Sequence, residues 1–353
     1  MLRFRSLRFY FSLEHRRCSG LGWEFISFVS ACGPPGVCFG VKMSEAMNSD
    51  KLVIAVCTRR RMAGLAELVP ELMSQIVGAG LQPNIRLLIV DNDSEGSAKP
   101  TVDFLQSAFD GVEMAYVVEA RGGVGYARNR AFSERRAGEW LIFFDDDQLP
   151  GAEWLGSFWA VLKEGRQGMW SGPVTPVFDT DTPGWGGEGW PWGSERGLLA
   201  DGSDQMSAGF GNILMSPACL DHPACRVTEE FLEGPGEDTL VTLALRRVGF
   251  VITFVSAPRA TEKVEKSRLT KEWVLARSYA GGRAWAKAMS TRGVGGMARV
   301  VLSALKAAVT GSFCALSASG PSDDSEELRM RGRTDFARAR GLLSLLADSK
   351  RKL

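Results

Sequence analysis

Three consecutive aspartates, Asp145, Asp146 and Asp147, directly follow four apolar residues at positions 141–144. In an open α/β sheet, ligands bind beyond the carboxyl ends of the strands. Because residues two apart in an extended chain point to the same side, we expect Asp145 and Asp147 to face one ligand. Crowded carboxylates repel one another unless a cation neutralises them, and oxygen ligands suit Mg²⁺ or Mn²⁺, which also take phosphate oxygens. The triplet predicts a site for a metal and a phosphate-bearing ligand; the alternative is a solvated acidic turn that caps the next helix.

Polar residues also end the first two predicted strands. Thr58 closes the apolar run at 51–58, and Asp91 and Asp93 close the run at 85–93. These residues are expected at the same sheet edge as the triplet. A carboxylate there can accept hydrogen bonds from a base N–H or a ribose hydroxyl. Turn capping explains either aspartate singly, but it explains less well their recurrence at successive strand ends.

A glycine-rich loop opens a predicted helix in the segment RGGVGYARNRA at 121–131. Glycines such as Gly123 let the backbone approach a ligand closely, and Arg128 lies near a helix start, which favours phosphate. Gly123 and Gly125 also match part of the dinucleotide-binding fingerprint, so a nicotinamide-dependent enzyme is an alternative. The third glycine position of that fingerprint is Arg128, which weighs against it.

Two adjacent acids, Glu237 and Asp238, precede an amphipathic segment at 239–249. Acids near a helix N-terminus stabilise the helix, so capping explains them. The alternative is a general base that takes a proton from an acceptor hydroxyl. The local sequence does not choose between the two.

Strands and helices alternate along the chain and would position these residues. We expect strands at 51–58, 85–93, 112–120, 140–147, 210–216 and 250–258, and helices at 65–77, 101–109, 125–137, 154–164 and 237–249. This alternation predicts an α/β fold with a mostly parallel sheet flanked by helices. Helical segments are also predicted at 267–289, 296–316 and 335–353, as a C-terminal extension.

Composition divides the chain into regions at 1–47, 48–258 and 259–353. We expect the Arg-rich first region to be disordered, or to be a mis-assigned start with the protein beginning near Met43 or Met47. Strands are expected to end at about Arg259. The basic helices of the last region predict peripheral contact with an anionic membrane, or packing against the preceding domain or a second copy in a homodimer.

The 42 Lys and Arg residues nearly balance the 41 Asp and Glu residues, so no nucleic-acid partner is predicted. Seven scattered cysteines, an odd number, argue for reduced thiols in a cytoplasmic protein. If the protein contacts a membrane peripherally, we expect this at the inner face of the plasma membrane. No run of 18 uncharged apolar residues is present, so no clear spanning helix is expected. A Gly- and Pro-rich loop holds Trp185, Trp190 and Trp192, which either contact an acceptor or pack the loop.

Taken in order, these motifs resemble those of the family 2 glycosyltransferases with the GT-A fold. The resemblance covers about residues 50–280 and rests on the segments CTRRR, VDNDS, GGVGYARNRA, FFDDDQLP, SGPV, GFGNILMS and GEDTLVTLALRRVG. It implies an inverting enzyme that moves one sugar from a nucleotide-sugar donor to a glycan or lipid-linked acceptor in cell-surface polysaccharide or glycolipid assembly. The Gln-x-x-Arg-Trp signature of processive synthases is absent, which favours transfer of a single sugar.

The resemblance also implies roles for residues. Those expected to bind the nucleotide-sugar are Thr58, Asp91, Asp93, Gly123, Arg128, Asp145 and Asp146. Asp147, with Asp145, would ligate the Mg²⁺ or Mn²⁺ that bridges the diphosphate, and Asp238, beside Glu237, would be the catalytic base. Many relatives place a metal-binding histidine after the last strand, where this chain has Glu262. The alternatives are a sugar nucleotidyltransferase and a catalytically silent nucleotide-sugar-binding scaffold.

Overall fold

Seven strands form the central sheet of the computed structural model, which describes residues 51–109, 111–178, 181–186, 192, 199–318 and 323–350. The extension expected at 1–47 lies outside these residues. In spatial order the strands are β3 (Glu113–Val118), β2 (Ile85–Asp91), β1 (Leu52–Thr58), β4 (Trp140–Asp145), β8 (Asn212–Met215), β6 (Met169–Ser171) and β9 (Ile252–Phe254). Only β8 runs antiparallel to its neighbours, β4 and β6. The predicted mostly parallel sheet is confirmed.

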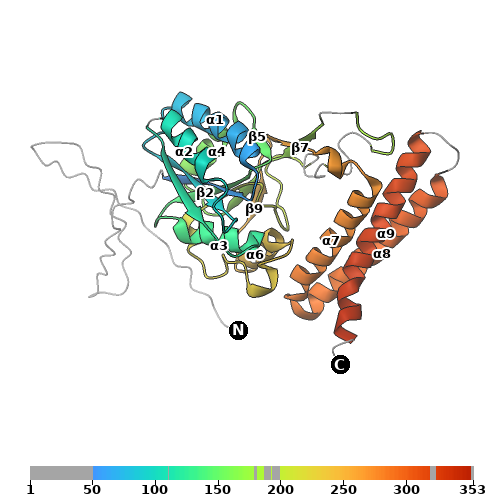
Figure 1. Cartoon of the computed structure of the whole chain (residues 1–353). Helices are drawn as coiled ribbons and strands as arrows, with labels where there is room; N and C mark the ends of the chain where they lie inside the picture. The colour runs from blue at the N-terminus through green and yellow to red at the C-terminus, as the bar shows by residue number, and fades with distance from the viewer. Residues whose placement is uncertain are drawn as a thin grey trace, which may run out of the picture. The chain divides into compact units, whose positions relative to one another are not determined.

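Helices cover both faces of this sheet (Figure 1). One face carries α1 (Met62–Gly78), α2 (Lys99–Ala108) and α4 (Trp154–Lys163), and the other carries α3 (Val124–Glu134), α5 (Pro217–Leu220) and α6 (Glu237–Arg247). Side chains alternate along β1: Ile54 packs into the first core, and Val53 and Ala55 pack into the second. Because both faces are buried, every strand residue of β2 is buried as well.

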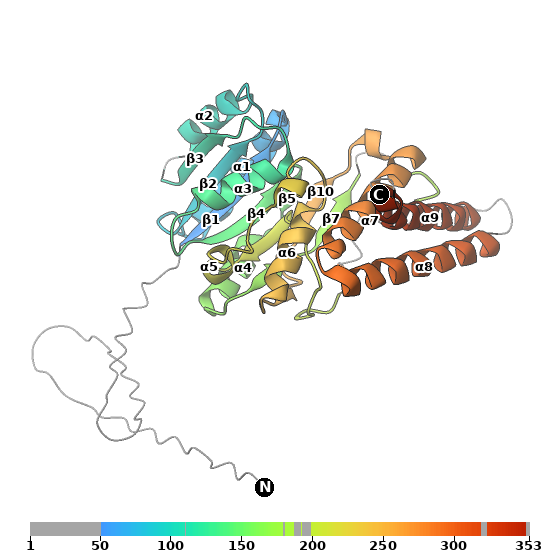
Figure 2. The ribbon, with the colours of Figure 1, turned by 90° about the horizontal axis from the view of Figure 1, so that it is seen from below.

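A second, three-stranded sheet lies beside the first (Figure 2). Its presence shows that two of our expectations are wrong. Its order is β5 (Gln148–Pro150), β10 (Ala260–Lys263) and β7 (Val174–Val177). The strand expected at 140–147 is wrong in its last residues, because β4 ends at Asp145 and positions 146–147 form a turn into β5. The expectation that strands end at about Arg259 is also wrong, because β10 pairs with β5 and β7.

Three long helices follow the sheets: α7 (Lys271–Ser290), α8 (Gly293–Ser317) and α9 (Asp323–Lys350). The three helices pack together (Figure 1), and glycines lie where they approach closely. A Cβ on Gly282 of α7 would collide with the Arg338 carbonyl of α9, and a Cβ on Gly311 of α8 would lie 3.0 Å from the Gly332 carbonyl of α9. The C-terminal helical extension is therefore confirmed. Although no uncharged run of 18 apolar residues exists, α8 is long and apolar enough to cross a membrane by length and composition.

A buried ion pair joins the amino end of β2 to the segment before β4. Arg86 donates from Nε to Glu139 Oε1 at 2.8 Å and from Nη2 to Glu139 Oε2 at 2.7 Å. Both side chains are only 6% exposed, and Arg86 also donates to the Glu134 carbonyl. Such a pair is costly to break, since removing one partner leaves a buried charge without compensation.

Arg86→Met should therefore lower the free energy of unfolding by about 3–5 kcal/mol, as measured by urea denaturation. The double variant Arg86→Met/Glu139→Met should recover most of that loss because it removes both charges. If the single variant matches the wild type, this pair does not hold the two strands together.

Candidate functional site

The acidic triplet lies at the carboxyl edge of the central sheet, where Thr58 and three arginines contact its carboxylates. Asp146 is buried and accepts a hydrogen bond from the Thr58 hydroxyl at 2.7 Å, which ties the end of β4 to the end of β1. Burial raises the pKa of Asp146, while hydrogen bonds from Arg61 and Thr58 oppose that rise. Because the chain turns after Asp145, the expectation that Asp145 and Asp147 lie on one side of an extended strand is wrong.

Two arginines neutralise the outer part of the triplet. Arg61, in the loop after β1, donates from Nη1 to Asp146 Oδ1 at 2.8 Å and to Asp147 Oδ2 at 3.0 Å. Arg268, after β10, donates to Asp147 Oδ2 at 3.2 Å and to Glu262 Oε1 at 2.8 Å. Burial, and then the charge of Asp147, raise the pKa of Glu262. Glu262, which stands where many relatives have a metal-binding histidine, is thus linked to Asp147 through the Arg268 guanidinium.

A third arginine neutralises the inner carboxylate. Arg128 of α3 donates from Nη2 to Asp145 Oδ1 at 2.5 Å and lies over the ring of Phe143, 4.6 Å from its centroid. The residue is 4% exposed, and its Nε and Nη1 are buried without a hydrogen-bond partner among the described residues. Gly211 leaves the space for Asp145, because a Cβ there would lie 2.6 Å from Asp145 Oδ2.

The two aspartates at the end of β2 differ in their surroundings. Asp91 is fully buried and accepts hydrogen bonds from the Asp93 and Ala98 amides and the Tyr116 hydroxyl. Those bonds fix the turn after β2. Asp93 pairs with Arg60, whose Nε lies 3.0 Å from Asp93 Oδ2. Arg60 is the only described non-glycine residue with a positive φ, 55°, a conformation that commonly marks functional loops.

The glycine-rich loop packs against another part of the chain. A Cβ on Gly123, whose φ is 146°, would collide with the Leu232 carbonyl, and a Cβ on Gly125 would lie 2.7 Å from Leu232 Cα. The Gly125 amide donates to the Leu232 carbonyl, and the Gly123 amide donates to Asn92 Oδ1. In this structure the glycines therefore allow close approach of the segment before α6. This contact holds the start of α6 near the edge of the sheet.

Glu237 and Asp238 begin α6 in different environments. Asp238 is half-buried, and its Oδ1 accepts a hydrogen bond from the Thr239 amide at 2.5 Å. Glu237 is buried, and burial together with the charge of Asp238 raises the pKa of Glu237 to about 7. The charges of Arg128 and Asp145 also act on Glu237, so the start of α6 belongs to the same electrostatic cluster.

Two of the tryptophans in the predicted aromatic loop serve packing. Trp185 is buried with Val274 of α7 and Met330 of α9. Trp192 lies against Trp185, with ring centroids 5.4 Å apart, and donates from Nε1 to the Arg268 carbonyl at 2.8 Å. Trp190 lies outside the described residues. The contact with Arg268 links this loop to the acidic triplet.

The residues fit a divalent metal only in part. Within the described ranges, no group of three or more His, Cys, Asp or Glu could hold a metal ion. However, Mg²⁺ needs only one or two protein carboxylates when substrate phosphates supply further oxygens. Asp145 and Asp147 are the carboxylates that would supply them, and each now pairs with an arginine.

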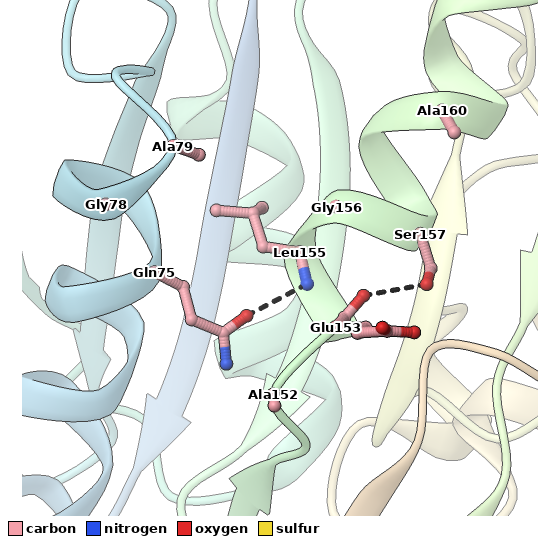
Figure 3. A pocket seen from close by; sticks show the side chains of 9 residues that line it. All are labelled: Gln75, Gly78, Ala79, Ala152, Glu153, Leu155, Gly156, Ser157 and Ala160. Carbon is pink, nitrogen blue, oxygen red and sulfur yellow. Dashed lines mark hydrogen bonds between the residues drawn. The ribbon is translucent and has the colours of Figure 1, made fainter.

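A separate depression lies between the end of α1 and the start of α4 (Figure 3). Its volume is about 650 Å³. Gln75 links α1 to the start of α4 there, because it accepts from the Leu155 amide and donates to the Gly151 carbonyl. The rest of the lining consists of small residues, Leu155 and one carboxylate, Glu153, so it offers little chemistry. None of the predicted site residues lines it.

Residues 53–218 match the family model described as "Glycosyl transferase family 2". The succinoglycan biosynthesis protein ExoM of Rhizobium meliloti (strain 1021) is 26% identical over 276 residues, covering 78% of this chain and 85% of that protein. The mannosyltransferase PcManGT of Pyrobaculum calidifontis, solved with GDP-Man and Mn²⁺, aligns with a TM-score of 0.51 at 13% identity, covering 85% and 75% of the two chains. S. aureus TarS aligns with a TM-score of 0.48 at 15% identity over 70% of this chain, which spans only 50% of the TarS chain.

The family match thus covers the part of the chain that forms most of the central sheet, and the α/β fold is that of the GT-A class. Sequence reasoning did not identify Arg61 or Arg268 as part of the site. The run of three arginines directly after Thr58 was the available signal for Arg61, because it begins at a predicted sheet edge. Arg268 had no such signal, since its approach depends on β10 pairing with β5.

The raised pKa of Glu237 predicts how stability changes with pH. A carboxyl group with a higher pKa in the folded state stabilises the fold below its unfolded pKa, and this contribution is lost as the pH rises to about 7. Glu237→Gln should therefore gain stability relative to the wild type between pH 5 and pH 8, as measured by urea denaturation at both values. A stability difference that does not change with pH would contradict this electrostatic environment.

Proposed function

We propose that the protein is an inverting glycosyltransferase that moves one sugar from a nucleoside-diphosphate sugar to a hydroxyl acceptor. The observation that carries the proposal is the cluster of Asp145 and Asp147 with three arginines at the carboxyl edge of a GT-A sheet. The family match and the ExoM similarity support sugar transfer in polysaccharide assembly. Transfer of a single sugar is the expectation that we retain.

The arginines suit a diphosphate. Arg61 and Arg268 are partly exposed, and each holds a carboxylate that a metal ion could take over. A divalent cation and a diphosphate bring charges of opposite sign, so their joint entry leaves the cluster near neutrality. The two guanidiniums would then pair with phosphate oxygens, for which their planar donor geometry is well suited.

A metal, Mg²⁺ or Mn²⁺, would be held by Asp145 and Asp147, and when bound it would neutralise charge on the departing diphosphate. PcManGT binds Mn²⁺ with its donor, which makes this assignment reasonable. Arg128 would hold Asp145 in place, because its guanidinium is buried against two aromatic rings. Thr58 would hold Asp146 and so set the turn between the two ligands.

The nucleoside would lie over the ends of β1 and β2. We assign its main contact to Asp93 rather than Asp91, because Asp91 already accepts three internal hydrogen bonds. Arg60 would move with Asp93, since it is exposed and paired to that carboxylate. Gly123 would act indirectly, by holding the loop that follows β3 against Asn92.

The chemical step would use Asp238 as the base. Asp238 takes the proton from the acceptor hydroxyl, and the oxygen attacks the anomeric carbon from the face opposite the diphosphate. The bond from that carbon to the phosphate oxygen breaks, and the nucleoside diphosphate leaves with the electron pair. Glu237, whose pKa of about 7 allows both protonation states, would hydrogen-bond to the acceptor or the sugar beside the base.

The acceptor would be a glycan or a lipid-linked sugar, by analogy with a protein of succinoglycan biosynthesis. Trp185 is a weak candidate for acceptor contact, because it is buried against α7 and α9. Trp192 is less buried and lies next to Arg268, so it is the better candidate. These assignments place the acceptor between the aromatic loop and the start of α6.

The function is tested by measuring nucleoside diphosphate release from a panel of UDP-, GDP- and dTDP-sugars with Mn²⁺ or Mg²⁺ and a glycan acceptor. We expect one donor to be used, with inversion at the anomeric carbon. Asp238→Asn should lower kcat by roughly 10²–10⁴-fold and leave donor affinity nearly unchanged, because the base acts after binding.

Asp103→Asn is the matched control, since this carboxylate is exposed on α2 and pairs with Lys99. It should retain wild-type activity. Full activity of Asp238→Asn would exclude Asp238 as the base. If Glu237→Gln then lost activity, Glu237 would be the base instead. Turnover of none of the donors would count against the proposed reaction as a whole.

A further inference from the structure

One face of α8 exposes a continuous row of large apolar side chains. They are 38% to 89% exposed, and they are Val294, Val301, Leu302, Leu305, Val309, Phe313 and Leu316. Single exposed apolar residues are common on soluble proteins, but a contiguous patch marks an interaction surface. This row is therefore a candidate docking surface.

The exposed row lies opposite the packed side of the helix. The residues of α8 that are buried against its neighbours are Gly296, Val300, Ala304, Ala307 and Gly311. With ~100° of rotation per residue, these five project in one direction, and the exposed apolar residues project in the other. From Val294 to Leu316 the exposed row is roughly 33 Å long, at 1.5 Å per residue.

Positive charge borders this row. Arg292, Arg299 and Lys306 are exposed, seven residues apart, and they therefore line one flank of the apolar face. The helix contains no Asp or Glu. Residues 271–350 hold thirteen Lys or Arg against seven Asp or Glu, in a chain whose net charge is only +1. The positive charge is thus concentrated in the helices that carry the apolar face.

We propose that α8 docks on an anionic lipid bilayer, lying parallel to its surface with the exposed apolar row among the acyl chains. An apolar face bordered by basic residues is the arrangement that binds the interface of a membrane. Arg292, Arg299 and Lys306 would meet the anionic headgroups, each adding electrostatic attraction. The surface would hold the protein where a lipid-linked acceptor is located, but the docking itself does not depend on the proposed reaction.

Two other occupants fit less well. If α8 crossed the bilayer, it would have to leave α9 or carry that helix into the hydrocarbon, and α9 holds five arginines between Arg329 and Arg340. If a second copy covered the face, its α8 would bring the same basic row and no acid to pair with it. The basic residues beside the apolar row are thus complementary in charge to anionic lipid. They are not complementary to the hydrocarbon core or to a second copy of α8.

The test is co-sedimentation of the full chain with vesicles. Wild-type protein should bind vesicles of phosphatidylcholine with roughly a third phosphatidylglycerol, and should bind pure phosphatidylcholine much less. Leu305→Glu/Val309→Glu should reduce the bound fraction roughly tenfold or more, because it places two charges among the acyl chains. Arg299→Gln/Lys306→Gln should weaken binding and its dependence on salt.

The matched control is Phe104→Glu on α2, an equally exposed apolar position outside α8, which should bind like the wild type. Equal binding to both vesicle types, or none to either, would overturn the proposal. Resistance of membrane-bound protein to alkaline extraction would replace it with a spanning helix. A wild-type dimer that Leu305→Glu/Val309→Glu separates, without vesicle binding, would replace it with a second copy.

Discussion

Like charges at one strand end repel one another, so the carboxylates of Asp145, Asp146 and Asp147 need positive charge beside them. Three arginines supply that charge, from the loop after β1, from α3 and from the segment after β10. Residues far apart in the sequence therefore meet at one edge of the sheet. Other contacts at this edge of the sheet hold the arginines and the aspartates in place.

Close backbone packing positions the three arginines and the acids. Gly211 makes room for Asp145, and Gly123 and Gly125 let the loop after β3 rest on Leu232, immediately before α6. Through these contacts the buried pair of Arg128 and Asp145 lies within electrostatic reach of Glu237. The small sheet then brings Glu262 and Arg268 toward Asp147, because β10 pairs with β5 directly after the triplet. The residues that we assign to the donor site and to the base are thus brought together from separate loops on one scaffold.

Much of the fold could be predicted from the sequence because apolar runs mark its strands. Leu52, Ile89 and Phe144 lie in runs that are buried on both faces, and parallel strands place their ends at one edge. The turn at Asp146 and Asp147 could not be predicted, since three identical residues give no signal for where a strand ends. Nor could the pairing of β10, which depends on a partner more than a hundred residues earlier.

The central claim is that this acidic edge is the site of the donor diphosphate, and a crystal structure with the preferred nucleoside diphosphate and Mn²⁺ tests it most directly. We expect an anomalous Mn²⁺ signal in contact with Asp145 or Asp147 and with phosphate oxygens. We also expect Arg61 and Arg268 to leave Asp147 for the diphosphate. Nucleotide bound away from this edge, for instance in the depression beside Gln75, with both arginines still on Asp147, would contradict it.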